Sequence, residues 1–574
     1  MSVAAEEGHR RAGRLGVRLE SLLLALIATV FAARLHLVFA SEVNWDEFLF
    51  LSRVHDLARG DLDLVLQTAH VHLFTWLPLV SGNEVDQVVA ARLVVFALSI
   101  ATALLLYRVF RHMLSGARAA LFAVFCYASF SFVMQHGSSF RADGIVTALL
   151  VGAIYLVLVR GSLLAAAAAG VLIGLAGMVT IKAALYLPTI GMLMLGQALL
   201  APRGLPEIGR AAAAVSCAAL AFAGAYFLHG FSLGDVAGYS SGGMLARSYQ
   251  RTIEQPGLFP QWRIFVHAAL ANGGIVVALL VGLALAVARA ARARGEARIR
   301  ALMLLSLAAP LATLLFYRNS FPYYYVFLLA PASVLCGLAA ERLPWRQRRE
   351  QATAIAAAAL IAIGAGAAAN YVKAAGRGPD VQRATLDVVH RMFPEPVAYI
   401  DRCSMVASFP KAGFFMSSWG MLNYYEAGRP IMRQTLIERE PRFLIGNIEA
   451  LDLDNLVDGE YGRGHYRLLR EDVETLKVNF VHHWGAIYVA GKTLAATGEA
   501  EAFEMLVPGP YTLEGRAVLI DGNVVRPGEV VQLAAGNHVA TGMSTVGGRV
   551  TLRWGEALYR PSGPPPDGPV FHGF

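Results

Sequence analysis

The apolar stretch Leu22–Ala40, LLLALIATVFAARLHLVFA, and the polar segment after it, Ser41–Phe48 with the sequence SEVNWDEF, decide the fold class. The first stretch has the length of about 20 residues that crosses the hydrocarbon core of a bilayer. It would place the carboxylates of Asp46 and Glu47 at a membrane face, which suits chemistry on a lipid-borne substrate. The alternative interpretation is a pair of solvated acids in a loop beside a helix end.

Further apolar runs of span length follow, in a chain of 574 residues that is 56% apolar. This pattern predicts a polytopic α-helical membrane protein. Eleven spans are expected, at residues 22–40, 88–108, 118–136, 143–159, 162–180, 183–200, 210–229, 264–288, 300–317, 323–341 and 352–371.

Positive charge gathers in alternate loops between these spans, most clearly in Arg289–Arg300, and contributes to a net charge of +8. An excess of Lys and Arg marks cytoplasmic loops. The N-terminus is therefore expected in the cytoplasm and the region after Tyr371 outside. The positive charge is thus explained by the orientation of the chain in the membrane. For this reason no nucleic-acid partner is expected.

The composition changes near Lys373. Residues 1–372 are predicted to form a transmembrane catalytic domain. Residues 373–500 mix helical and strand patterns and are predicted to form an extracytoplasmic α/β domain. Residues 501–574 have strand-like runs between Gly and Pro turns, which predict a small antiparallel β-sandwich. Its Pro/Gly-rich tail, Pro561–Phe574, is expected to be loosely ordered.

The segment HGSSFRADG, His136–Gly144, joins two spans on the predicted outer face. Arg141 and Asp143 are expected to pair and to bring a second carboxylate to that face. Alternatively, Asp143 caps the helix that follows it. His136 is a candidate substrate contact.

Two cations are candidates for binding a phosphate. Lys182 lies between two apolar runs, where a charge is costly unless it is paired. A lipid phosphate would pair with it, or it would snorkel to the headgroups. Arg318, in YRNSFPYYY at Tyr317–Tyr325, suits bidentate phosphate contact. Its neighbours Tyr323 and Tyr324 either contact the ligand or belong to an interfacial belt.

Two further outer segments carry candidate substrate-binding residues. His70 and His72 lie in HVHLFTWLP, which is too short to span and is typical of an interfacial or re-entrant helix. Arg247 lies in the loop 230–263, which could close over a substrate. The four cysteines have no metal or disulfide spacing, and no phosphate-binding glycine motif is present.

Taken together, these features resemble the GT-C class of integral-membrane glycosyltransferases. The bacterial members similar to protein O-mannosyltransferases and to the lipid A aminoarabinose transferase are closest. The resemblance covers about residues 15–371 and rests on Asp46-Glu47 after the first span, Arg141-x-Asp143 after the third, Lys182 before the sixth and Phe321-Pro322-Tyr323-Tyr324 opening a late span.

The resemblance implies many helices with catalytic loops on the extracytoplasmic side of a bacterial inner membrane. It also implies a polyprenyl-phosphate sugar donor and a catalytic acid in the first outer loop. The chain departs from the family in two places. It lacks the Trp-Trp-Asp-Tyr-Gly motif of oligosaccharyltransferases, and His70–Phe74 stands where members often have Lys/His-Pro-Pro-Leu.

This pattern predicts a single-displacement reaction that inverts the configuration at the anomeric carbon of the sugar. Asp46 or Glu47, with Asp143 as a further catalytic acid, would deprotonate a hydroxyl of a glycan, lipid or protein acceptor. Lys182, Arg318 and Arg141 would bind the donor phosphate. The sequence indicates no particular cofactor, and a divalent cation is compatible with the scheme. The alternatives are a ligase that uses a lipid pyrophosphate, a flippase or transporter of lipid-linked sugar, and a non-catalytic assembly factor.

Overall fold

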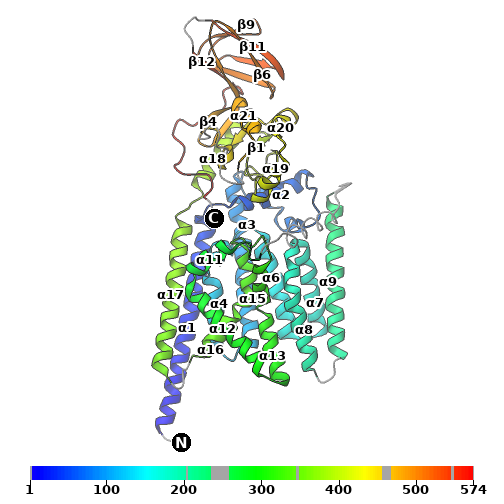
Figure 1. The fold of residues 1–574 in the computed structure, drawn as a ribbon, viewed down its shortest axis with the longest axis vertical. Coiled ribbons are helices and arrows are strands. Elements are labelled where there is room, and N and C mark those ends of the chain that lie inside the picture. The colour runs from blue at the N-terminus through cyan, green and yellow to red at the C-terminus, as the bar shows by residue number, and fades with distance from the viewer. Residues whose placement is uncertain are drawn as a thin grey trace. The chain divides into compact units, whose positions relative to one another are not determined.

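A computed structural model describes residues 3–201, 205–233, 258–343, 348–454, 467–543 and 548–572 (Figure 1). The chain divides into two compact units. The membrane unit comprises residues 1–41, 56–75 and 89–377. The C-terminal unit comprises residues 42–55, 76–88 and 378–574. The second unit therefore includes two pieces of the predicted first outer loop, one of which carries Asp46.

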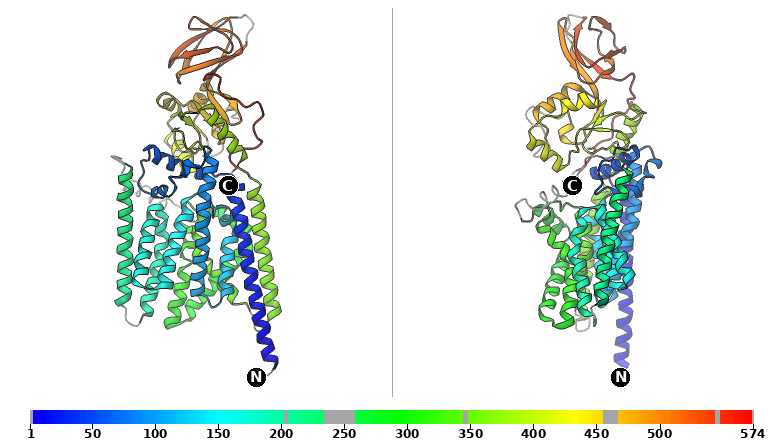
Figure 2. Two further views of the ribbon diagram at one scale, coloured as in Figure 1. Left: turned by 180° about the vertical axis from the view of Figure 1, so that it is seen from behind. Right: turned by 90° about the vertical axis from the view of Figure 1, so that its right-hand side faces the viewer.

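The described part of the membrane unit is mostly helical, and its helices run alongside one another, with α1 beside α17 in the left view of Figure 2. They are α1 (Val3–Ala40), α3 (Glu84–Met113), α4 (Ala117–Ser129), α5 (Ser131–His136), α6 (Ala142–Tyr155), α7 (Leu163–Val179), α8 (Leu187–Leu200), α9 (Leu205–Ser232), α11 (Trp262–Ala271), α12 (Gly273–Arg292), α13 (Gly295–Ser306), α14 (Ala309–Ala312), α15 (Tyr324–Ala332), α16 (Val334–Glu341) and α17 (Arg349–Ala375).

Eight helical segments in the described residues are long and apolar enough to cross a membrane, and α13 with α14 makes a ninth if that pair, bent by 50°, counts as one span. These nine coincide with predicted spans. The other two predictions fall on shorter apolar helices, α7 and α4. The fold is thus that of a multi-pass helical membrane protein.

Two predicted spans, 118–136 and 264–288, are broken in the structure. The first breaks at Phe130 between α4 and α5, and the second at Asn272 between α11 and α12. The Asn272 side chain accepts a hydrogen bond from the Ser131 N–H at 2.8 Å and donates to the Ser131 hydroxyl at 2.7 Å. A broken helix is tolerated at membrane depth because such bonds satisfy the freed backbone groups.

Helices α7 and α9 approach closely through two glycines. A Cβ atom on Gly170 would lie 2.2 Å from the Ala214 carbonyl oxygen, and one on Gly174 would lie 2.4 Å from that of Ala218. This spacing of small residues is typical of tight helix packing in membranes.

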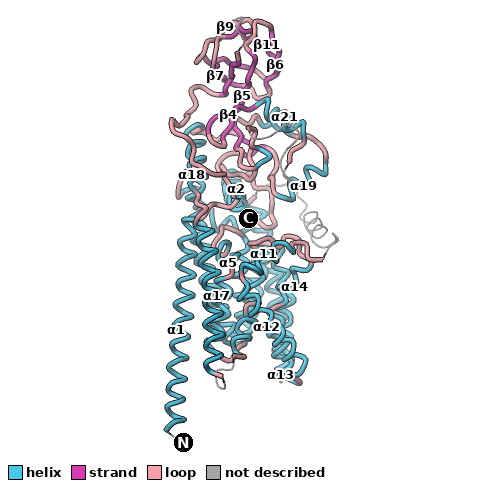
Figure 3. Tube along the Cα trace, turned by 60° about the vertical axis from the view of Figure 1, so that its left-hand side comes forward, coloured by secondary structure: helices cyan, strands magenta, loops and turns pink. Residues whose placement is uncertain are grey.

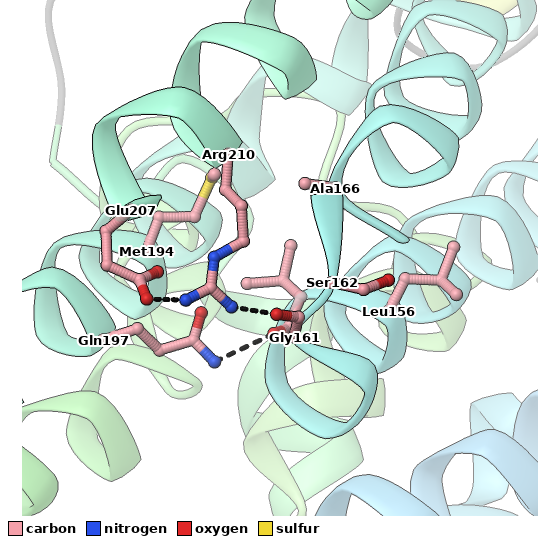
Figure 4. A pocket seen from close by; sticks show the side chains of 9 residues that line it. Leu156, Gly161, Ser162, Ala166, Met194, Gln197, Glu207 and Arg210 are labelled. Atoms are coloured by element: carbon pink, nitrogen blue, oxygen red, sulfur yellow. Dashed lines mark hydrogen bonds and ion pairs between the residues drawn. The ribbon is translucent and has the colours of Figure 1, made fainter. Parts of the chain in front are cut away.

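The far end of α6 is closed by polar contacts around a small cavity (Figure 4). Arg210 of α9 contacts Glu207 and the Gly161 carbonyl, and Gln197 of α8 donates to the Val157 carbonyl at 2.8 Å. The cavity follows the π-helix η3 (Leu156–Arg160), whereas Asp143 lies at the start of α6, roughly 20 Å away along the axis. These contacts join three helices and lie away from the candidate site residues.

The first outer loop holds α2 (Trp45–Arg59) and two 3-10 helices, η1 (Ala69–Phe74) and η2 (Leu77–Leu79). The predicted interfacial helix over 70–78 is therefore two short tight turns. A further 3-10 segment, η4 (Ile181–Tyr186), precedes α8 and carries Lys182.

All described strands belong to the C-terminal unit (Figure 3). They are β1 (Tyr399–Ile400), β2 (Lys411–Ala412), β3 (Phe443–Ile445), β4 (Phe480–Trp484), β5 (Ile487–Ala495), β6 (Ala500–Met505), β7 (Gly509–Glu514), β8 (Val518–Ile520), β9 (Asn523–Val525), β10 (Val530–Leu533), β11 (Gly536–Gly542) and β12 (Arg549–Trp554). Four helices accompany them, namely α18 (Asp380–Met392), α19 (Ser418–Ala427), α20 (Met432–Arg439) and α21 (Arg470–Asn479).

One eight-stranded sheet runs in the order β10-β7-β12-β5-β3-β1-β2, with β4 also paired to β5. Strands β1, β2 and β3 are parallel, and the other pairs are antiparallel. A second sheet, β6-β11-β8-β9, packs against the antiparallel end through a shared apolar core that includes Phe503, Leu513 and Val550. The predicted β-sandwich is present, but β5 joins it to the α/β part, so the predicted boundary at residue 500 cuts through continuous structure.

The expectation of a loosely ordered tail is wrong for its described end. The side chain of Val570 is 6% exposed, and its carbonyl accepts a hydrogen bond from Gln382 of α18 at 3.0 Å. Nearer its start, the Gly563 carbonyl accepts from the Trp484 indole at 3.0 Å. The backbone carbonyls of Gly563 and Val570 thus have defined donors, in spite of a composition typical of disorder.

Candidate active site

The two acids of the first outer loop have different surroundings. The side chain of Asn44 accepts a hydrogen bond from the Asp46 N–H at 3.0 Å, and the Glu47 carboxylate accepts one from the Asn44 N–H at 3.0 Å. This reciprocal pattern is a capping box at the start of α2. Glu47 is fully buried, whereas Asp46 is partly exposed.

Glu47 is therefore poorly placed for the catalytic role that the sequence allowed it, because a buried capping carboxylate is committed to the helix end. Asp46 remains the candidate base. It lies near the loop that follows β1, where burial raises the pKa of the Cys403 thiol well above its usual value and the carboxylates of Asp401 and Asp46 raise it further.

Three charged side chains meet in the membrane unit. The Lys182 ammonium lies 2.8 Å from one carboxylate oxygen of Asp143, and Arg141 Nε lies 3.5 Å from the other. The side chains of Asp143 and Arg141 are only 5% and 6% exposed, and that of Lys182 is 15% exposed. We call Arg141, Asp143 and Lys182 the charged triad.

The triad confirms the predicted Arg141–Asp143 pair and adds a contact that the sequence analysis did not foresee. Lys182 forms an ion pair with Asp143, whereas the sequence analysis considered only a lipid phosphate or the headgroups as its partner. Asp143 is not the helix N-cap, because α6 begins at Ala142 and Arg141 occupies the capping position. In the first turn of α6 its negative charge still favours the helix.

Two tyrosines at the start of α15 complete the triad's surroundings. The Tyr323 ring centroid lies 3.5 Å from the Arg141 guanidinium carbon and 5.0 Å from the Lys182 nitrogen. The Tyr324 ring is 5.9 Å from the same nitrogen, and its hydroxyl lies 2.7 Å from that of Thr313. Both rings therefore present their faces to cations, an arrangement that suits a site for charged ligands.

A cavity of about 750 Å³ lies among α8, α11, α12, α13, α14 and α15. Its wall is apolar apart from Ser306 and Tyr325. Tyr325 follows directly on the two tyrosines at the triad, so α15 takes part in both the charged site and the apolar cavity. Sequence analysis missed this cavity, because its apolar residues cannot be told from those that face lipid.

The histidines His70 and His72 of η1 gather with His229 of α9. His72 Nε2 lies 2.9 Å from His229 Nδ1, whose Nε2 lies 2.8 Å from the Thr68 hydroxyl. His70 is buried, and burial, with a smaller effect from His229, lowers its pKa to about 4. His70 is thus neutral at ordinary pH. The contact between His72 and His229 joins the first outer loop to α9.

The remaining candidate residues are His136, Arg318 and Arg247. His136 is half-buried at the end of α5, with its ring 6.5 Å from that of Phe132. Arg318 is half-buried, and its backbone carbonyl accepts a hydrogen bond from Gln261 at 3.0 Å. Arg247 lies outside the described residues. Over the part of the chain that the structure describes, no three His, Cys, Asp or Glu residues form a metal-binding group.

No protein-family model and no curated protein sequence matches the chain. The structure is similar to ArnT from Cupriavidus metallidurans bound to undecaprenyl phosphate, with a TM-score of 0.50 and 14% identity over 68% of this chain and 86% of ArnT. For apo ArnT the TM-score is 0.50 and the identity 14%, over 74% and 92% of the two chains.

The archaeal oligosaccharyltransferase AglB from Archaeoglobus fulgidus, in complex with an inhibitory peptide and a dolichol-phosphate, is similar with a TM-score of 0.51 and 12% identity. That match covers 90% of this chain and 76% of AglB. Identities this low establish the fold alone. The chain has the fold of GT-C integral-membrane glycosyltransferases, as the sequence resemblance implied.

Proposed function

We propose that this protein transfers a sugar from a polyprenyl-phosphate donor to a hydroxyl-bearing acceptor. The proposal is supported by two features that meet at helix α15. The charged triad contacts Tyr323, directly before the helix, and Tyr325 of the helix lines the 750 Å³ apolar cavity. A lipid phosphate has these two chemistries, an anionic head and a long apolar chain. ArnT and AglB, which have this fold, were solved with undecaprenyl phosphate and dolichol-phosphate.

The triad supplies the charge for the phosphate head. It holds two cations and one carboxylate, and Asp143 keeps the Lys182 ammonium fixed at 2.8 Å. Positioned cations stabilise the negative charge that develops on a leaving phosphate without further reorganisation. Arg318 is proposed as an additional phosphate contact, with Tyr323 and Tyr324 as contacts to the donor.

Asp46 is proposed as the general base. It takes the proton of the acceptor hydroxyl while that oxygen forms a bond to the anomeric carbon. The bond from this carbon to the phosphate oxygen breaks, and polyprenyl phosphate leaves with the electron pair. A single displacement of this kind inverts the anomeric carbon, and a phosphate needs no general acid to leave.

The proposed setting is a bacterial inner membrane, with the N-terminus in the cytoplasm and the C-terminal unit outside. The arginine-rich segments between spans, such as Arg289–Arg300, support this orientation. The acceptor is a glycan, a lipid or a protein. His70, His72 and His136 are proposed as contacts on the substrate side.

A variant that fills the cavity tests the donor site. Ala309→Trp places an indole in the cavity wall. Val215→Trp is the control, because Val215 is 69% exposed on α9. We expect native mass spectrometry to detect bound polyprenyl phosphate on the purified wild-type protein and on the control, and about tenfold less on Ala309→Trp. Equal occupancy in all three proteins, or no bound polyprenyl phosphate in any, would contradict the proposed donor.

A further inference from the structure

The segment that carries Asp46 is held by three distant parts of the C-terminal unit. The first is Gln382 of α18, whose side-chain amide bridges the backbone of Val43. The Val43 N–H donates to Gln382 Oε1 at 2.8 Å, and Gln382 Nε2 donates to the Val43 carbonyl at 2.8 Å. Gln382 is 1% exposed, so water cannot compete for these bonds.

The second part is the end of the chain. Phe571 lies edge-to-face with Trp45 and with Phe48, with ring centroids 6.1 Å and 6.0 Å apart. The backbone N–H of His572 donates to the Glu42 carboxylate at 3.1 Å, and the His572 ring nitrogen Nδ1 lies 2.7 Å from the same oxygen. The tail therefore contacts residues on both sides of Asp46.

The third part is the loop after β1. The Arg402 guanidinium carbon lies 3.8 Å from the centroid of the Trp45 ring, and the Arg402 backbone N–H donates to the Asn447 side chain at 2.9 Å. Trp45 is the residue directly before Asp46. Its ring is thus in contact with Arg402 as well as with Phe571.

We propose that the C-terminal segment Val570–His572, with Gln382 and Arg402, positions Asp46 for the transfer reaction. The inference rests on the proposed function, in which Asp46 is the base. A base works only when it is held at the reacting proton, and a displacement of about 1 Å can cost about 100-fold in rate. The capping box fixes the helix end, and the three contacts fix where that helix end lies within the C-terminal unit.

The full-length protein with Phe571→Ala tests this inference, with Phe571→Tyr as the conservative variant and Asp567→Ala, at an exposed position in the tail, as the control. We expect Phe571→Ala to lower kcat about 100-fold, with the KM for the donor and the bound polyprenyl phosphate unchanged. Phe571→Tyr and the control should stay within about threefold of the wild-type rate.

Two further readouts separate positioning from a general structural effect. In the Asp46→Asn background Phe571→Ala should cause no further loss, because the group it positions is already gone. Hydrogen exchange should accelerate in the peptide covering residues 42–52 and not in β7. Wild-type exchange in that peptide, a wild-type rate, or an additive loss with Asp46→Asn would overturn the inference. An inactive wild-type protein would refute the proposed function instead, and the exchange result would still decide whether the tail holds the segment.

Discussion

The Asp46→Asn protein is expected to lose sugar transfer by about 1,000-fold, within the range that a positioned general base contributes. The substitution keeps the shape of the side chain and removes its ability to accept the acceptor's proton. The hydrogen bond from the Asp46 N–H to Asn44 comes from the backbone, so the start of α2 should remain intact. The measurement is turnover in membranes or detergent at matched amounts of folded protein.

Asp61→Asn is the matched control, because Asp61 also lies in the first outer loop and its side chain is 63% exposed beside Arg59. It should retain the wild-type rate. Glu47→Gln should be less stable, since it weakens the capping box, while its residual rate per folded molecule stays well above that of Asp46→Asn. A lower rate for Glu47→Gln than for Asp46→Asn would instead assign Glu47 as the base and Asp46 as the structural acid.

The second large effect concerns the charged triad. Lys182→Met removes the 2.8 Å partner of Asp143 and leaves a buried carboxylate with Arg141 at 3.5 Å. Breaking a buried pair in this way costs about 3–5 kcal/mol in the free energy of unfolding. The Asp143→Asn/Lys182→Met double variant removes these two charges together and should regain part of that stability, because Arg141 loses its carboxylate partner but keeps its contact with the Tyr323 ring. Its transfer rate should nevertheless remain about 100-fold low, because the Lys182 ammonium that is proposed to face the phosphate is gone.

Thermal unfolding and transfer are measured on the two single variants and the double variant. The Asp86→Asn/Arg383→Met variant is the control, because it removes a half-exposed 2.7 Å ion pair of the C-terminal unit. Such pairs contribute about 0–1 kcal/mol, so both readouts should stay near wild type. A double triad variant that is stable and fully active would mean that the triad is purely structural.

The fold class and much of the membrane unit could be predicted from the sequence, because span length and the period of apolar residues are local properties. The Arg141–Asp143 pair could also be predicted from the sequence, since the two residues are two positions apart. Lys182 was recognised as a costly charge, but its partner Asp143 is 39 residues away, and nothing local connects them. The breaks at Phe130 and Asn272 likewise depend on a contact between distant helices.

The different surroundings of Asp46 and Glu47 could be predicted in part from the sequence. Asn44 followed three residues later by Glu47 has the form of a capping box, which would have marked Glu47 as the structural acid. The contacts of the C-terminal segment could not be predicted from the sequence. Glu42 and His572 are 530 residues apart, and the composition around His572 is typical of disorder. The apolar cavity was equally hidden, because its lining and the lipid-facing surface are built from the same residues.

The most direct test of the account is transfer by the purified wild-type protein from defined donors carrying the same sugar, namely a polyprenyl monophosphate, a polyprenyl pyrophosphate and a nucleotide. We expect product from the polyprenyl monophosphate alone, with inverted configuration at the anomeric carbon. Product from the pyrophosphate alone would indicate a ligase. Movement of the intact lipid across a vesicle membrane without any transfer would indicate a flippase, and either result would contradict the account.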